Sequence, residues 1–202
     1  MTSARRLTLA AAAFATSAAL VLSGCANQEP GSAATFSDSR ITEAQLTDQV
    51  MAVLEAKGQS TSTPDAGLVQ QTLGRMITMV LVDRLAEEQG LAVTQGDLDE
   101  MRVRLEAQVG GSEALQQAFL QENVAPSQLE ALLLLQIQAQ ELGIALNPRG
   151  SAEEQGMAVF EAVSALSTDL DTTVSPRFGT WDPISLSLGA VPNDLSTPPV
   201  IE

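Results

Sequence analysis

The segment RMITMVLVDRLAEEQG, residues 75–90, has the strongest bearing on the fold of this 202-residue chain. Between Met76 and Val82 only Thr78 is polar, so apolar residues occupy most sides of any helix formed here. A helix of that kind is expected to be surrounded by other helices. The sequence therefore predicts a long central helix that ends at Gly90, where glycine supplies the left-handed conformation of a helix stop.

Further helices are predicted on both sides of this central one. Capping patterns, in which a Ser, Thr or Asp side chain can bond the first free backbone N–H groups, mark the starts of these helices. The expected starts are Thr42, Pro64 for the central helix, Thr94, Ser112, Ser127 and Ser151. Gly143 is expected to end one helix, and Gly74 is expected to mark a close helix crossing. With no strand between these helices, the pattern predicts an all-α, small orthogonal helical domain.

The chain is expected to comprise five segments. Residues 1–24 form a signal peptide, and residues 25–40, rich in Gly, Ala, Ser and Thr, form a flexible linker. Residues 41–147 form the helical domain, and residues 148–188 complete it with a C-terminal helix and a short extended segment. Residues 189–202 form a disordered tail.

The signal-peptide interpretation depends on Arg5 and Arg6, which precede an uncharged, alanine-rich run. Leu22-Ser23-Gly24-Cys25 then resembles the lipobox of bacterial lipoproteins, in which the cysteine carries diacylglycerol. This resemblance implies that Cys25 is lipidated and that the mature protein is anchored to the cell membrane at its extracytoplasmic face. The alternative is that Cys25, the only cysteine of the chain, is an ordinary small buried residue.

Composition limits the chemistry of the protein. The net charge is −15, the opposite of what a nucleic-acid-binding surface needs. The chain has no histidine and no tyrosine, which excludes Ser-His-Asp and Cys-His nucleophilic sites and zinc sites with imidazole ligands. No phosphate-binding glycine motif is present. We therefore expect no cofactor, no metal, no nucleic-acid partner and no small-molecule substrate, and we interpret the acidic residues as a solvated face.

Four short motifs together resemble a known family. They are Ile41–Leu46, Arg84–Ala86, Gly90–Thr94 and Asp97–Asp99, and their order and spacing are similar to those of the N-terminal domain of SurA-like periplasmic chaperones, the SurA/PrsA-type foldases. The resemblance covers roughly residues 41–143. It implies a SurA N-terminal fold and a role in protein folding. Gln95 and Asp97 stand where relatives often have Asp and Glu, which leaves the capping chemistry possible.

Many members of this family continue with a parvulin-type prolyl isomerase module. Only about sixty residues follow Gly143 here, and the histidine that such sites generally use is missing. We therefore expect no isomerase activity. The ending SPRFGTWDP, residues 175–183, resembles that of actinobacterial lipoproteins of the SurA-like type. Its Phe178 and Trp181 have two interpretations, docking onto the helical core or forming a recognition patch for another chain.

The leading hypothesis is a membrane-anchored, non-enzymatic chaperone or holdase for unfolded and newly exported polypeptides. A thin helical domain rich in leucine and methionine is expected to leave apolar surface open for such partners. The candidate client-binding residues are Met76, Met79, Leu81, Met101, Phe119, Phe178 and Trp181. Two alternatives stay open: a prolyl isomerase-related foldase, and a structural or adaptor lipoprotein with one dedicated partner.

Overall fold

A computed structural model describes residues 31–191. Within that range the protein is mainly helical, with six α-helices, two short 3-10 turns and five short strands. In chain order the elements are β1 Ser32–Thr35, β2 Arg40–Thr42, α1 Glu43–Ala56, α2 Ala66–Glu88, α3 Gln95–Val109, α4 Ser112–Gln121, η1 Pro126–Gln128, α5 Leu129–Leu146, α6 Ala152–Asp169, β3 Thr173–Val174, η2 Pro176–Phe178, β4 Trp181–Asp182 and β5 Ser187–Leu188.

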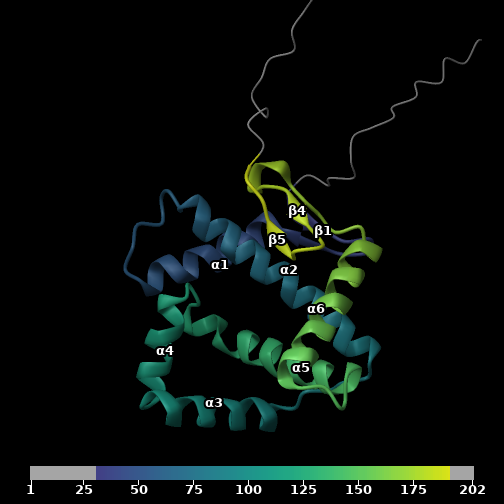
Figure 1. Ribbon diagram of the computed structural model, residues 1–202. Helices are drawn as coiled ribbons and strands as arrows, with labels where there is room; N and C mark the ends of the chain where they lie inside the picture. The colour runs from purple at the N-terminus through teal and green to yellow at the C-terminus, as the bar shows by residue number, and fades with distance from the viewer. Residues whose placement is uncertain (1–30, 192–202) are drawn as a thin grey trace, which may run out of the picture.

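The strands gather at one end of the molecule, beside α1 and α2, and both ends of the described chain lie there (Figure 1). Three of the strands form an antiparallel sheet in the order β2-β1-β3, and β4 pairs with β5 in a separate hairpin. The helices α3 and α4 lie at the opposite end of the molecule. The expectation of an all-α domain is therefore correct for the helices and wrong for the two ends of the described chain.

The expected flexible linker over residues 25–40 is wrong for its second half. Strand β1 is the central strand of its sheet, with Ala33 and Ala34 fully or almost fully buried, and Phe36 after it is also buried. A strand covered on both faces shows no alternation of apolar and polar residues, so the sequence carries no period that would identify it. Residues 25–30 lie outside the described part of the chain, as do the signal peptide and residues 192–202 of the expected tail.

Two groups of buried side chains hold the fold together. The larger one joins the sheet, α1, α2, α6 and the C-terminal half of α5, with Leu73, Ile77, Leu81 and Leu142 fully buried in it. The smaller one joins α3 and α4 to the N-terminal half of α5 around the fully buried Leu133. Because α5 contributes to both, and also packs against α2, it connects the two ends of the molecule.

Three of the six predicted helix starts are confirmed by their capping bonds. The side chains of Thr42, Thr94 and Ser151 each accept a bond from the backbone N–H three residues on, and the side chain at that position accepts one from the backbone N–H of the cap residue. The other three starts differ. Ser112 is the first residue of α4 and makes no cap, because Gly111 holds the N-cap position.

The start of α5 also differs, because this helix begins after a 3-10 turn. Here the Gln128 side chain accepts a bond of 3.0 Å from the Ala125 backbone N–H, in place of a cap by Ser127. In α2 the cap is Asp65, so Pro64 lies just outside the helix rather than in its first turn.

Two glycines have roles that differ from those expected. Gly143 lies inside α5, which continues to Leu146, and a side chain there would meet Gln155 Cβ of α6 at 3.0 Å. Gly143 therefore permits the close contact of α5 with α6. The expected close crossing at Gly74 is absent, because the nearest atom to a Cβ there is Leu188 Cδ1 at 3.9 Å, an ordinary contact.

Candidate functional site

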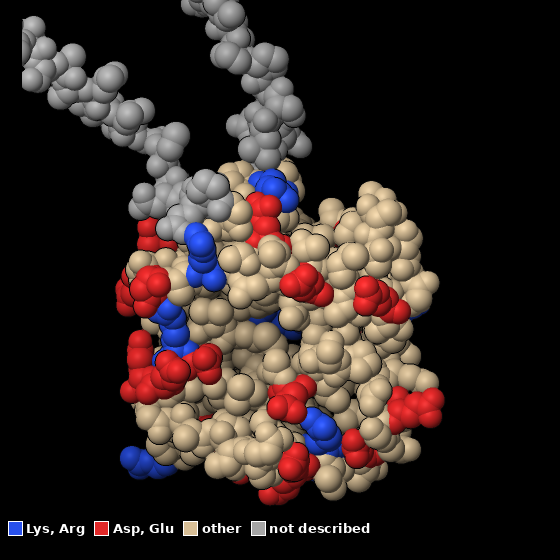
Figure 2. All heavy atoms as spheres, turned by 180° about the vertical axis from the view of Figure 1, so that it is seen from behind, with Lys and Arg blue, Asp and Glu red and all other residues tan. Residues whose placement is uncertain are grey.

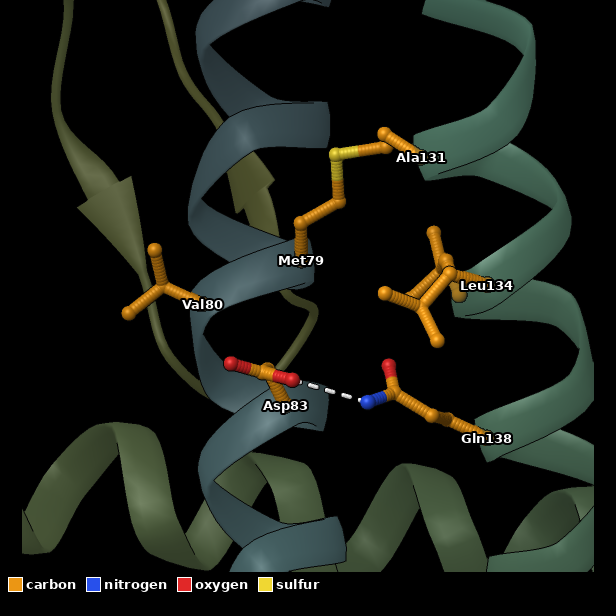
Figure 3. A pocket seen from close by; sticks show the side chains of 7 residues that line it. Met79, Val80, Asp83, Ala131, Leu134 and Gln138 are labelled. Carbon is orange, nitrogen blue, oxygen red and sulfur yellow. Dashed lines mark hydrogen bonds between the residues drawn. The ribbon is translucent and has the colours of Figure 1, made fainter. Parts of the chain in front are cut away.

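A groove between α2 and α5 is the best candidate for a binding site in the described residues. Its volume is about 220 Å³, and it is lined by Met79, Val80 and Asp83 of α2 and by Ala131, Leu134, Leu135 and Gln138 of α5. Figure 3 shows Met79 beside Ala131 at one end of the groove and Asp83 beside Gln138 at the other. The lining is thus largely apolar, with its polar groups at one end.

The groove is open because α5 carries more apolar side chains than its neighbours cover. The stretch Pro126–Leu146 contains an 18-residue window with a mean hydropathy of 1.3, long and apolar enough to cross a membrane, yet only 33% of that window is buried in the structure. It packs against α2, α3 and α6, as the central helix of a bundle does. Leu133 and Leu142 face these neighbours and are fully buried, whereas Leu134 and Leu135 remain partly exposed at the groove.

The polar end of the groove is fixed by one hydrogen bond between the two helices. Gln138 Nε2 donates to Asp83 Oδ1 at 2.8 Å (Figure 3). Gln138 is buried, so this bond satisfies a side-chain amide that would otherwise lose its hydration without compensation. This bond therefore fixes the distance between α2 and α5 at the polar end of the groove.

The structure divides the predicted client-binding residues into two groups. Met79 lines the groove, Met76 is half-buried against the larger core, and Phe119 is half-buried against the smaller one. The prediction is wrong for Leu81, Met101 and Trp181, which are 0%, 6% and 7% exposed. Leu81 lies on the face of α2 that packs into the larger core, and Met101 lies on the face of α3 that packs into the smaller core.

Both aromatic residues of the SPRFGTWDP segment dock onto the helical core. Trp181 is buried, and its indole Nε1–H donates to Ser167 Oγ of α6 at 2.9 Å. Phe178 is half-buried against the larger core, with the Arg177 guanidinium 4.7 Å from its ring centre. Of the two interpretations left open by the sequence, intramolecular docking is therefore the one that the structure supports.

Sequence reasoning did not identify the α5 side of the groove. A signal for it was present, since Leu132–Leu135 is a run of four leucines, more than one helix face can bury in a core. The position of α2 relative to α5 decides which of these leucines stays accessible, and that position depends on contacts distant in the sequence.

The net charge of the protein is negative, and the acidic side chains lie at several separate positions on the surface. Figure 2 shows one face on which acidic side chains and fewer basic ones are scattered over a mostly uncharged surface, with a hollow near its middle. Four carboxyl groups have a lowered pKa, each because of a local hydrogen bond. The donors are Arg84 for Asp38, Thr94 for Asp97, the Ser151 backbone for Glu154 and Ser185 for Asp182.

These four carboxylates have structural partners in a cap, a turn or an ion pair, and a lowered pKa keeps them ionised at neutral pH. A general acid needs the opposite shift. Residues 31–191 contain no group of three or more Cys, Asp and Glu side chains placed to hold a metal ion.

The chain was compared with protein-family models, with curated proteins and with solved structures, and none of the three comparisons finds a match.

Proposed function

We propose that the protein is a non-catalytic holdase that binds unfolded or newly exported polypeptides in the groove between α2 and α5. The observation that carries this proposal is the partly exposed apolar lining that Met79, Leu134 and Leu135 give to the groove. An extended chain can place apolar side chains into such a groove without adopting a particular fold. The SurA-like motifs of the sequence support the same function, and a SurA-type fold is part of the proposal.

The size of the groove sets the expected affinity. At about 220 Å³ it has room for only a few apolar side chains, and burying each one contributes about 1.5–3 kcal/mol. Association itself costs several kcal/mol, so one client segment is held weakly, with a Kd on the order of a millimolar. Weak binding of single segments suits a holdase, because the client must be released to fold.

We place this activity at the membrane. Cys25, the proposed lipidation site, lies outside the described residues, and the ordered body begins at β1 only a few residues later. A Cys25→Ser variant is expected to move from the membrane fraction to the soluble fraction and to lose incorporation of labelled palmitate. Retention of this variant in the membrane fraction would refute the anchor.

An aggregation assay tests the holdase proposal. At a concentration near the millimolar Kd, and in several-fold molar excess over the client, the full chain is expected to reduce the light scattering of a chemically unfolded exported protein as denaturant is diluted. Ala131→Glu places a charge in the groove at an exposed helical position and should remove the protection. Ala165→Glu, at an exposed position of α6 outside the groove, is the matched control and should keep it.

The proposal fails if the unmodified chain does not reduce scattering, or if both Glu variants protect equally well.

The proposed absence of catalysis has a separate test. In a proline-limited refolding assay the full chain should leave the slow phase unchanged, and an acceleration abolished by a point mutation would establish isomerase activity. Crosslinking in cells that yields one stoichiometric partner, instead of many clients, would make the protein an adaptor.

A further inference from the structure

Two basic side chains meet on a single asparagine between α1, α2 and the segment that follows α4. Lys57 Nζ, at the end of α1, donates to Asn123 Oδ1. Arg75 Nη2, on α2, donates to the backbone oxygen of the same residue at 2.9 Å. Asn123 itself has a left-handed φ of 60° and donates from Nδ2 to Gln71 Oε1 at 2.6 Å. The two cations are therefore held close together by one residue.

Neither cation has a carboxylate partner among the described residues, although the chain has 25 acidic residues against 10 basic ones. Four other arginines do form ion pairs, namely Arg84 with Asp38, Arg102 with Glu130, Arg104 with Glu100 and Arg177 with Glu43. In a protein this acidic, two neighbouring cations without a carboxylate form a local region of the opposite charge.

Arg75 has unused bonding capacity. It is half-buried, and burial lowers the pKa of its guanidinium from the ordinary value because the charged group has lost part of its hydration. A guanidinium has five N–H donors in one plane, and within residues 31–191 Arg75 forms a single bond, to the Asn123 carbonyl. A carboxylate would accept two of the remaining donors and offset the lost hydration.

Arg75, which shares Asn123 with Lys57, lies one helical turn beyond the Met79 end of the groove, the end opposite Gln138. Residues one turn apart lie on the same face of a helix, so Arg75 is the neighbour of Met79 along α2. Met79 is beside Ala131 and Asp83 is beside Gln138, so α2 and α5 run side by side in the same direction (Figure 3). Arg75 therefore precedes Met79 on α2, and η1 and Asn123 precede Ala131 of α5 at the same end of the two helices.

The groove thus has an apolar end at Met79, with Arg75 one turn beyond it on α2, and an acidic end at Asp83. Arg75 and Asp83 are eight residues apart on α2, or about 12 Å at 1.5 Å per residue. An extended peptide advances about 3.3 Å per residue, so three or four of its residues span this distance. A negative charge at the Arg75 end is attracted, and a negative charge at the Asp83 end is repelled.

We propose that the groove selects the C-terminal end of its polypeptide partners. The terminal carboxylate binds Arg75 and Lys57, and the apolar side chains of the last three or four residues contact Met79, Leu134 and Leu135. This inference rests on the proposed holdase function and adds to it a preference for free, apolar C-termini. Such a preference orients each client, because a bound C-terminus can fill the groove in only one direction.

A pair of short peptides tests this inference. Acetyl-Ala-Leu-Val-Leu with a free carboxylate, and the same peptide with a terminal amide, are titrated into the isotopically labelled full chain, and binding is followed by NMR chemical shifts. Charge-assisted hydrogen bonds predict that the free acid binds about tenfold more tightly than the amide. The Arg75 and Asn123 signals should move with the acid only, whereas the Met79 methyl signal should move with both peptides.

Variants show whether the two cations cause the preference. Lys57→Gln with Arg75→Gln removes both charges but keeps donors for Asn123, and should make the acid and the amide bind equally. Arg149→Gln, at an exposed residue outside the groove, is the matched control and should keep the tenfold difference. If the double variant unfolds by circular dichroism, Lys57→Gln alone is used, and it should reduce the preference several-fold.

Equal binding of acid and amide to the unmodified chain would overturn the inference, as would a preference that survives the loss of both charges. Failure of this kind is distinguishable from failure of the holdase function. A chain that suppresses aggregation but ignores the terminal carboxylate would leave the proposed function intact and show that Lys57 and Arg75 only tie the residues after α4 to α1 and α2.

Discussion

At the scale of single residues, the contact of Trp181 with Ser167 joins the C-terminal segment to the helical body. The indole is buried, and its N–H has one partner, a hydroxyl on the inner face of α6. Docking of Trp181 was one of the two interpretations that the sequence left open, because a large apolar ring is stabilised by burial. The partner could not be predicted, because it depends on the path of the chain between the two residues. The turn after α6 and the strand β3 bring the Trp181 ring back to Ser167.

A Ser167→Ala substitution is therefore expected to leave a buried indole N–H without a partner. This should lower the free energy of unfolding by about 1–3 kcal/mol. Urea unfolding followed by the fluorescence of Trp181, the only tryptophan of the chain, measures the change directly. Ser164→Ala, one turn earlier on α6 and half-buried, is the control and should change stability little. Equal stability of the two variants would show that the bond does not matter.

At the scale of elements, the helix starts at Thr42, Thr94 and Ser151 were predictable and the position of strand β1 was not. A capping bond depends on residues three positions apart, so Thr42, Thr94 and Ser151 are recognisable in the sequence. Strand β1 instead depends on distant partners: Thr35 Oγ1 lies 2.7 Å from Thr173 Oγ1, 138 residues further along the chain. Its small residues carry no period because both faces are covered.

The candidate groove was also predictable only in part, on its α2 side. Met79 was identified from its residue type, and the run Leu132–Leu135 indicated excess apolar surface. The sequence could not show that Leu133 is enclosed while Leu134 stays partly open, because α2 and α3 cover different sides of α5. It also gave no reason to connect Arg75 with Asn123, which lies after a different helix.

The contact of α5 with α6 depends on Gly143, where an added Cβ would meet Gln155 Cβ at 3.0 Å. Gly143→Val forces the two helices apart and is expected to lower the free energy of unfolding by about 1–3 kcal/mol. Gly156→Ala on α6 is the matched control, since nothing lies within 4 Å of its added Cβ. It should raise stability by up to about 1 kcal/mol through helix propensity. A Gly143→Val protein as stable as the unmodified one would contradict this packing.

At the scale of the whole molecule, the ordered body lies near its proposed anchor. Because β1 begins at Ser32, no more than about 25 Å of extended chain separates it from Cys25. A flexible linker up to residue 40 would have allowed about twice that reach. Strand β1 belongs to the end of the molecule that holds the sheet, whereas the α2–α5 groove lies between the two cores.

The free energy of unfolding should fall as the solution is made acidic. Asp38, Asp97, Glu154 and Asp182 have pKa values lowered in the folded state by hydrogen bonds. Near and below the ordinary carboxyl pKa values, the unfolded chain therefore binds more protons than the folded chain does. The free energy of unfolding thus falls as pH drops below about 4. With no histidine, stability should be nearly constant between about pH 5 and 7.

Urea unfolding at a series of pH values measures this dependence. About 0.5 M salt should be present, because it screens the repulsion of the net negative charge and leaves the short hydrogen bonds in place. A rise in stability on acidification from pH 4 to pH 3 under these conditions would show that the four carboxylates do not stabilise the folded state.

Photocrosslinking tests most directly whether the α2–α5 groove is the surface that holds other polypeptides. A photoreactive residue replaces Met79 in the full chain, which is then illuminated with a chemically unfolded exported protein. A second chain carries the same residue at Val103, which is 64% exposed on α3 and does not line the groove. Adducts should form from position 79 and be absent or far weaker from position 103. Equal adducts from both positions, or none from position 79, would contradict the account.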